Sequence, residues 1–241
     1  MGYERAAPYY DLFGAKDDGA FLAALLSRTG GPALVVGAGT AREALPLAAA
    51  GEEVVAVDRS EAMLAVAADK TAARRLGGRL RLLRADARDF SLRRRFPLVV
   101  ALNLFAHFVE EGEASAALRN FRVHLAPGGR LLLNVETPAW RPPDPPVEES
   151  RELGDGRRLR RTVKYRPTRR PHVYAIELWF DVLHGDLLLD RILERDEVRL
   201  FRPDEVRQLA ATAGLRVDEV YADFASAPLQ DSSPEAVFVF K

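Results

Sequence analysis

Cysteine is absent from the 241 residues of this chain. A disulfide framework, an iron–sulfur cluster and a cysteine-ligated zinc site are therefore excluded, and the composition fits a reducing compartment. The four histidines are scattered along the chain and show no ligand spacing with the acidic residues, so we predict no metal site.

An excess of charge of either sign is also missing, because 35 basic and 35 acidic side chains give a formal net charge of +0. A chain without an overall positive field has no general attraction for nucleic acid or for an anionic membrane surface. We therefore expect neither as a partner.

Long apolar runs are lacking as well, since the longest, residues 44–50, falls far short of the roughly 20 residues that cross a bilayer. The first residues, MGYERAAPYYDLF, lack the apolar core of a signal peptide. Ala6 occupies the position where N-myristoylation requires Ser or Thr. The sequence predicts a soluble, cytoplasmic protein.

Short apolar segments alternate with helical ones through the first half of the sequence. Residues 1–30 are expected to form a helical cap, because apolar side chains recur at helical spacing before a breaker at residues 29–32. The predicted strands that follow cover residues 33–36, 53–57, 80–84, 98–102 and 130–135, and the predicted helices cover residues 41–50, 61–75 and 113–125. Nearly all-apolar strands joined by helices predict a mostly parallel α/β sheet that is buried on both faces and doubly wound.

Proline interrupts this pattern between residues 138 and 146, where a stiff loop replaces helix and central strand. Three later segments alternate with the period of a β-strand and contain a tight turn at Gly185; they cover residues 159–166, 172–184 and 187–201. We predict an antiparallel β insertion over residues 138–201, which forms either a substrate lid or the contact of a homodimer.

The main fold resumes after the insertion. A helix is predicted to begin at Pro203, and strands over residues 215–221 and 236–240 bring the sheet to seven strands. Residues 1–137 and 202–241 then form one domain, which carries the N-terminal helical cap and the inserted β segment.

Arginine is concentrated in the insertion, at residues 157, 158, 160, 161, 166, 169 and 170. Such a patch could receive a phosphorylated or carboxylated substrate, or RNA. The acidic residues nearby favour instead a solvated strand face with ion pairs.

A glycine turn, Gly37-Ala38-Gly39, joins the first predicted strand to a helix. Glycines let a ligand approach the backbone, and a helix N-terminus offers free N–H groups to an anion. Asp58 ends the second strand, and Asp86 follows the third. Because the carboxyl ends of parallel strands meet at one edge of the sheet, these residues predict a site for a nucleoside-bearing ligand.

Other interpretations of these residues stay open. Asp58 and Asp86 are also typical of a helix cap and a loop turn, although Ser60 is an equally good cap for the helix at Glu61. A dinucleotide fingerprint would place a third glycine where this chain has Arg42, so an NAD-linked oxidoreductase is the weaker alternative.

The motifs YYDLF, VVGAGTA, AVDRSEAML, RADARDF and HLAPGGRLLLNV follow one another along residues 9–135. With them, residues 1–136 resemble the class I S-adenosylmethionine-dependent methyltransferases. The resemblance implies a Rossmann-like seven-stranded fold, S-adenosylmethionine as cofactor and S-adenosylhomocysteine as product.

The same resemblance assigns parts of the cofactor to residues. The glycine turn would hold its methionine part, Asp58 the ribose, and Asp86 with Ala87 the adenine. Tyr10 would close over the sulfonium and is a candidate catalytic residue. The full implied cofactor-binding set is Tyr10, Gly37, Ala38, Gly39, Asp58, Arg59, Met63, Asp86, Ala87 and Asn103.

Two positions depart from the family pattern. The family usually has an acid where this chain has Val35 and a glycine where it has Ala41. Since a buried ammonium needs a partner, Val35 has two interpretations. Either a neighbouring acid such as Glu43 replaces the missing one, or the chain is a non-catalytic homologue that binds the cofactor.

Residues 103–108, NLFAHF, follow the fourth strand and are similar to the NSFAH stretch of glycine and sarcosine N-methyltransferases. Methyl transfer is an in-line displacement that depends mainly on alignment, and His107 is the candidate base. The alternative is a histidine that only packs this loop. The insertion also resembles the lid of sugar-amine N-methyltransferases. We therefore predict a methyltransferase that acts on a small-molecule amine, with an RNA methyltransferase as a lesser alternative.

Overall fold

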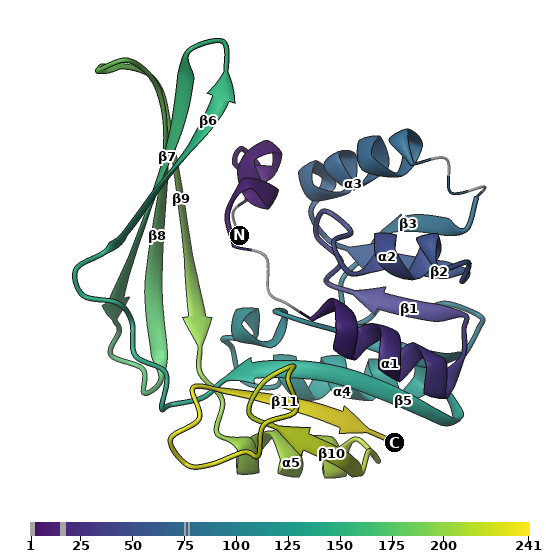
Figure 1. Cartoon of the computed structure of the whole chain (residues 1–241). Helices are drawn as coiled ribbons and strands as arrows, with labels where there is room; N and C mark the ends of the chain where they lie inside the picture. The colour runs from purple at the N-terminus through teal and green to yellow at the C-terminus, as the bar shows by residue number, and fades with distance from the viewer. Residues whose placement is uncertain (1–2, 15–17, 75, 77) are drawn as a thin grey trace.

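A seven-stranded sheet lies at the centre of the structure, a computed structural model that describes residues 3–14, 18–74, 76 and 78–241 (Figure 1). Its strands are β1 (Ala33–Val36), β2 (Val54–Asp58), β3 (Leu80–Arg84), β4 (Phe96–Ala101), β5 (Leu125–Glu136), β10 (Val217–Tyr221) and β11 (Glu235–Phe240). The strand order is β10-β11-β5-β4-β1-β2-β3. Strands β1 to β5 run parallel, and β11 pairs antiparallel with both β5 and β10. The predicted doubly wound, mostly parallel sheet is confirmed.

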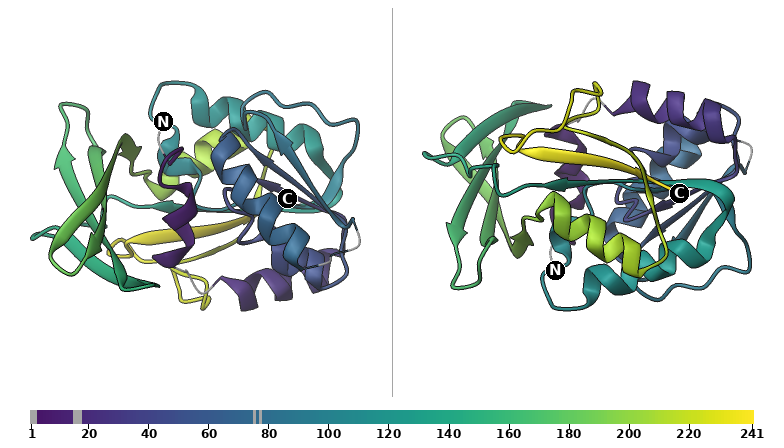
Figure 2. Two further views of the ribbon diagram at one scale, coloured as in Figure 1. Left: turned by 90° about the horizontal axis from the view of Figure 1, so that it is seen from above. Right: turned by 90° about the horizontal axis from the view of Figure 1, so that it is seen from below.

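Helices cover both faces of this sheet (Figure 1, Figure 2). One face carries α1 (Gly19–Thr29), α2 (Ala44–Ala49) and α3 (Glu61–Ala73), and the other carries α4 (Glu113–His124) and α5 (Pro203–Thr212). Successive side chains of a strand enter opposite cores, so Val35 packs under α1 and α2 while Val36 packs under α4. With both faces buried, the loops at the carboxyl ends of the strands are left to form a polar site.

Three differences from the predicted helix boundaries are larger than one residue. Helix α2 begins at Ala44 instead of Ala41, because Ala41 adopts a left-handed φ of 63° that no helix can include. Helix α3 ends at Ala73, and Arg75, its predicted end, lies outside the described residues. The predicted N-terminal cap consists of a short 3-10 helix, η1 (Ala7–Leu12), and the separate helix α1.

Residues 147–199 form a second sheet, the insertion sheet, which is antiparallel throughout (Figure 1). Its strands are β6 (Val147–Gly154), β7 (Arg157–Pro167), β8 (Val173–His184) and β9 (Leu187–Arg199), paired in chain order. The predicted antiparallel insertion and its turn at Gly185 are confirmed. Strand β6 was missing from the prediction, because VEESRELG carries only two large apolar side chains along an edge strand.

The apolar face of the insertion sheet packs against residues 3–14, which we call the N-terminal segment. Ala6 and Phe13 join a buried cluster with Leu159 and Phe180 of the sheet. The Phe13 and Phe180 ring centroids lie 6.2 Å apart, and the Arg161 guanidinium lies 4.6 Å from the Phe13 centroid. Helix η1 therefore lies between the insertion sheet and the main domain (Figure 1).

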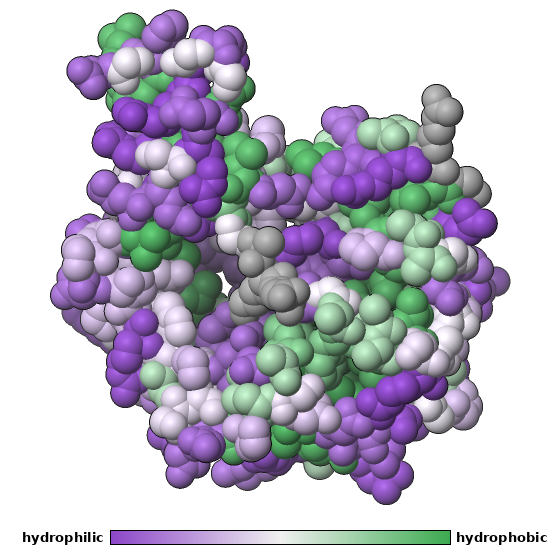
Figure 3. Space-filling model, viewed as in Figure 1, coloured by the Kyte–Doolittle hydropathy of each residue, from purple (hydrophilic) through white to green (hydrophobic). Residues whose placement is uncertain are grey.

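The arginines of the insertion are largely neutralised by acidic partners. Five of them form ion pairs: Arg157 with Asp155, Arg160 with Asp181, Arg161 with Glu149, Arg166 with Glu177, and Arg170 with Glu197. Hydrophilic side chains dominate the visible surface of this sheet (Figure 3). These ion pairs favour the interpretation of the arginine patch as a solvated strand face.

Across the described ranges, no helix has the length and hydropathy needed to span a bilayer.

Candidate active site

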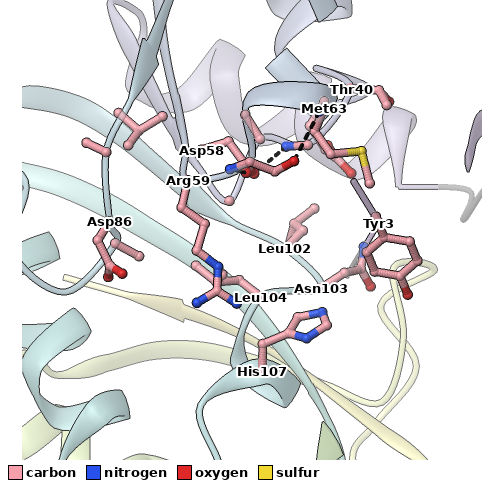
Figure 4. Close-up of a pocket in the computed structure, with 18 of the residues that line it drawn as sticks. Tyr3, Thr40, Asp58, Arg59, Met63, Asp86, Leu102, Asn103, Leu104 and His107 are labelled. Atoms are coloured by element: carbon pink, nitrogen blue, oxygen red, sulfur yellow. Dashed lines mark hydrogen bonds between the residues drawn. The ribbon is translucent and has the colours of Figure 1, made fainter. Parts of the chain in front are cut away.

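A pocket of about 1040 Å³ that opens to solvent lies at the carboxyl ends of β1, β2, β3 and β4 (Figure 4). The N-terminal segment supplies part of the wall of this pocket. All the residues that sequence analysis singled out for the cofactor and for catalysis line it: Tyr10, Gly37, Ala38, Gly39, Asp58, Arg59, Met63, Asp86, Ala87, Asn103 and His107.

The glycine turn brings backbone to the wall of the pocket. Gly37 and Gly39 have left-handed φ values of 70° and 51°, which non-glycine residues adopt only with strain. A Cβ on Gly37 would lie 2.9 Å from Cδ1 of Leu104. A Cβ on Gly39 would meet no atom within 4 Å, so there the free space of the pocket reaches the main chain. A ligand can therefore approach the backbone at Gly39.

Asp58 organises both loops beside it. Its Oδ2 accepts a hydrogen bond from Gly39 N at 2.7 Å, and its Oδ1 accepts one from Ser60 N at 2.8 Å. Ser60 is the cap of α3, since its Oγ accepts from Met63 N at 3.1 Å. Each carboxylate oxygen of Asp58 has a second lone pair, so the side chain retains capacity for two ligand hydroxyls.

Asp86 lies on the opposite side of the pocket from Tyr3 (Figure 4). Arg88 donates to it from Nε at 2.7 Å and from Nη2 at 2.6 Å. These hydrogen bonds outweigh the cost of partial burial and lower the pKa of the Asp86 carboxyl, so it is charged at neutral pH. Arg88 also pairs with Glu113. The carboxylate is thus a fixed acceptor at the tip of β3.

Two tyrosines of the N-terminal segment enclose the other end of the pocket. The Tyr3 and Tyr10 rings meet edge to face with centroids 5.2 Å apart. Burial raises the pKa of both phenols, which stay protonated at neutral pH. Tyr10 was predicted from its motif, whereas Tyr3 was not predicted, because no motif marks it.

Asn103 and His107 follow β4 on the loop that contains the 3-10 helix η2 (Phe105–His107). Asn103 has a left-handed φ of 53°, held by a hydrogen bond from its N–H to Asn134 Oδ1 at 2.7 Å. His107 lines the pocket, and its Nδ1 lies 3.2 Å from Oδ2 of Asp196 on β9. This partner was missed, because 89 residues separate the two in the sequence.

His124, which is buried, is fully engaged away from the pocket. Its Nε2 accepts from Leu92 N at 2.9 Å, and its Nδ1 lies 2.8 Å from Asn120 O.

In the described part of the chain no group of three or more Asp, Glu and His side chains is arranged to hold a metal ion. The predicted lack of a metal site stays a prediction.

Known proteins resemble both the sequence and the fold. The family model described as "Methyltransferase domain" matches residues 33–129. The cypemycin N-terminal methyltransferase of a Streptomyces species is 30% identical over 253 aligned positions, covering 99% of this chain and 96% of the relative. The CcbJ methyltransferase from Streptomyces caelestis superimposes with a TM-score of 0.80 at 27% identity, covering 98% of this chain and 95% of that one.

A further solved structure shows the same fold with less sequence similarity. The sugar N-methyltransferase KedS8 from Streptoalloteichus sp ATCC 53650 has a TM-score of 0.75 at 21% identity, with 99% of this chain and 92% of that one covered. The likeness extends over the insertion sheet as well as the main domain.

A Rossmann-like sheet with a glycine turn and two acids at neighbouring strand tips defines a nucleoside-binding α/β protein. The chain belongs to the class I S-adenosylmethionine-dependent methyltransferases. S-adenosylmethionine is its methyl donor. The similarities give no support to an NAD-linked oxidoreductase or to a non-catalytic homologue.

Proposed function

We propose that this methyltransferase acts on the nitrogen of a small-molecule amine. By name, one relative is the cypemycin N-terminal methyltransferase, and a structural neighbour, KedS8, is a sugar N-methyltransferase. The observation that carries the proposal is the position of His107, which lines the pocket where the main domain meets β9 of the insertion sheet. A base at that position suits an acceptor that must lose a proton.

When bound, S-adenosylmethionine supplies a methyl group on a positively charged sulfonium. The nitrogen lone pair of the acceptor forms the new N–C bond as the S–C bond breaks, and the nitrogen gives up one proton. His107 accepts this proton on its imidazole and releases it to solvent. Alignment of the reacting atoms supplies most of the remaining rate enhancement.

We also propose the cofactor-binding roles that the resemblance to the methyltransferase family implies. Asp58 would hold the ribose and Asp86 with Ala87 the adenine, while the glycine turn would hold the methionine part. Tyr10 would close over the sulfonium, because the face of an aromatic ring favours a cation. Arg59, Met63 and Asn103 complete the wall. The space at Gly39 and the lone pairs of Asp58 support this arrangement.

Glu43 is proposed to replace the acid missing at Val35. Val35 is 2% exposed and lies in the core under α1 and α2. Glu43, 8% exposed, lines the pocket, and its Oε1 accepts from Arg42 Nη2 at 3.0 Å. Arg42 lines the pocket too. The pair offers a carboxylate to the cofactor's ammonium and a guanidinium to its carboxylate.

Residues 138–201 are proposed to be the substrate lid over a methyltransferase domain formed by residues 1–137 and 202–241. The contact between Asp196 of β9 and His107 supports this division of roles. The homodimer stays a prediction.

The proposed function is tested with matched pairs of acceptors. Primary and secondary amines, including an amino sugar and a free peptide N-terminus, are compared with their alcohol counterparts, and S-adenosylhomocysteine is measured by mass spectrometry. We expect turnover of amines only. We expect His107→Gln to lower kcat by about 100-fold or more, in line with general base catalysis, with S-adenosylhomocysteine affinity retained.

His184→Gln is the matched control, because His184 is an exposed residue at the end of β8. It should leave kcat unchanged. Turnover of alcohols with none of any amine would contradict the proposal.

A further inference from the structure

His107 has a specific partner on the insertion sheet. Its Nδ1 lies 3.2 Å from Asp196 Oδ2, and the side chains are 25% and 16% exposed. The other carboxylate oxygen, Oδ1, accepts from the backbone N–H of Glu197 at 2.9 Å. The backbone of β9 thereby fixes the orientation of the carboxylate that faces the imidazole.

The charge state of Asp196 decides the direction of this hydrogen bond. Burial disfavours the charged carboxylate, but the hydrogen bonds from His107 and from the Glu197 backbone help to outweigh it, and the net effect lowers the pKa of Asp196. At neutral pH the side chain is therefore an anion and can only accept. Nδ1 of His107 must carry the proton, which leaves the lone pair on Nε2.

Two described neighbours of His107, Asn134 and Arg59, do not compete for Nδ1. Elements β5 and β9 pack against η2, and at this level β5 presents the uncharged Asn134, whose amide is bonded to Asn103 and Glu235. The Arg59 guanidinium extends over the pocket above His107, and Tyr3 lies across from it (Figure 4). Arg59 can only donate, so it cannot accept the Nδ1 proton.

From this geometry we propose that Asp196 is a positioning residue, which holds His107 in the tautomer protonated on Nδ1 so that Nε2 is free to act as the base. The inference rests on the proposed role of His107. The acceptor's proton moves to Nε2, the proton on Nδ1 stays shared with Asp196, and the anion stabilises the imidazolium that forms. The insertion sheet is thus part of the catalytic apparatus, since the base is complete only while β9 contacts η2.

Asp196→Asn tests this role, because the amide of asparagine can donate to Nδ1 and so move the proton of His107 to Nε2. The tautomer is measured by nitrogen-15 NMR of histidine-labelled protein, with His107→Gln used to assign the signal. We expect the Nδ1-protonated form in the parent protein and the Nε2-protonated form in Asp196→Asn. Glu197→Gln, one residue along the same strand, should leave the tautomer unchanged.

The reaction provides a second readout. With an amine acceptor, Asp196→Asn should lower kcat at least about 10-fold with little change in KM, and Asp196→Glu should restore part of the loss. S-adenosylhomocysteine binding by calorimetry shows whether each variant is folded.

The two proposals fail in different ways. An Nε2-protonated His107 in the parent protein, an unchanged tautomer in Asp196→Asn, or an unchanged kcat would overturn the role of Asp196. A tautomer that switches as expected, in a protein that methylates no amine, would support the positioning contact and overturn the proposed function instead.

Discussion

Among single residues, Glu43 has an uncommon environment for an acid, since it is buried in the wall of a ligand pocket beside Arg42. Burial raises the pKa of its carboxyl in spite of the arginine. The charged form is therefore lost at a higher pH than for an exposed glutamate. If this carboxylate binds the cofactor's ammonium, cofactor affinity must fall as the pH drops through that raised pKa.

Glu43→Gln tests this role. We expect S-adenosylhomocysteine binding to weaken about 10-fold or more at neutral pH, because a hydrogen bond between two charged groups is lost. 5′-Methylthioadenosine, which lacks the amino-acid end, is the matched ligand and should bind both proteins equally. The weakening of S-adenosylhomocysteine binding at mildly acidic pH should also disappear in the variant. Equal losses for both ligands would contradict the assignment.

The two glycines of the turn should respond differently to alanine. An alanine at either position would be strained by the positive φ. Only at Gly37 would the new Cβ also contact a side chain, because it would lie 2.9 Å from Cδ1 of Leu104. We expect Gly37→Ala to lower the free energy of unfolding by about 2 kcal/mol or more, and Gly39→Ala by about 1 kcal/mol. Gly39→Ala should instead weaken S-adenosylhomocysteine binding, since its Cβ enters the pocket. Thermal unfolding and calorimetry of the two variants check this contrast, and identical behaviour would contradict it.

Site residues could be predicted from the sequence where a motif or a predicted strand lies beside them in the chain. The glycine turn, Asp58 and Asp86 each stand directly after a predicted strand, and the topology of a parallel sheet brings such positions together. Tyr3 and Asp196 carry no such signal. Tyr3 reaches the pocket through the packing of the N-terminal segment, and Asp196 reaches His107 through the packing of β9, so both placements depend on contacts between distant parts of the chain.

At the scale of elements, the insertion sheet carries an ion-pair cluster that joins three strands around one buried carboxylate. Asp181 of β8 is 3% exposed and accepts from Arg191 Nε at 2.6 Å and from Arg160 Nη2 at 2.8 Å. The hydrogen bonds from Arg191 and Arg160 outweigh partial burial and lower the pKa of the Asp181 carboxyl. A carboxyl with a lowered folded-state pKa stabilises the fold above its unfolded pKa, and the contribution is lost as pH falls through the folded value.

Asp181→Asn should therefore lower the Tm at neutral pH, because both arginines lose a buried anionic partner. The difference from the parent protein should shrink as the pH falls below about 4, near the ordinary pKa of an aspartate. Asp155→Asn is the matched control, since Asp155 pairs with Arg157 in a turn where its side chain is 60% exposed. A Tm difference for Asp181→Asn that stayed constant into acid would contradict the account.

Elements with clear periodicity were predictable, and their ends were less so. Strands β1, β2, β4 and β11 are nearly all apolar, so their positions could be placed within two residues, whereas β5 begins at Leu125, five residues before its predicted start. Strand β6 escaped prediction, because an edge strand needs few apolar side chains. The start of α2 was misplaced, because the left-handed backbone of Ala41 follows from the turn around the ligand site and not from helix propensity.

Over the whole molecule, three parts of the chain converge on one pocket. The strand tips of the main sheet supply the glycine turn, Asp58 and Asp86, the N-terminal segment supplies Tyr3 and Tyr10, and β9 reaches His107 through Asp196. Figure 2 shows the N-terminal segment between the two sheets from above and from below. The walls of the pocket and the contact to His107 therefore depend on packing between distant parts of the chain.

The central claim is that the pocket at the strand tips holds S-adenosylmethionine through Asp58. Isothermal titration calorimetry of the protein and of Asp58→Ala with S-adenosylhomocysteine tests it most directly. We expect micromolar binding in the parent protein and a loss of about 10-fold or more in the variant, where two ribose hydrogen bonds to a charged acceptor disappear and Gly39 N loses its partner. Unchanged affinity in Asp58→Ala, or no binding in the parent protein, would contradict the account.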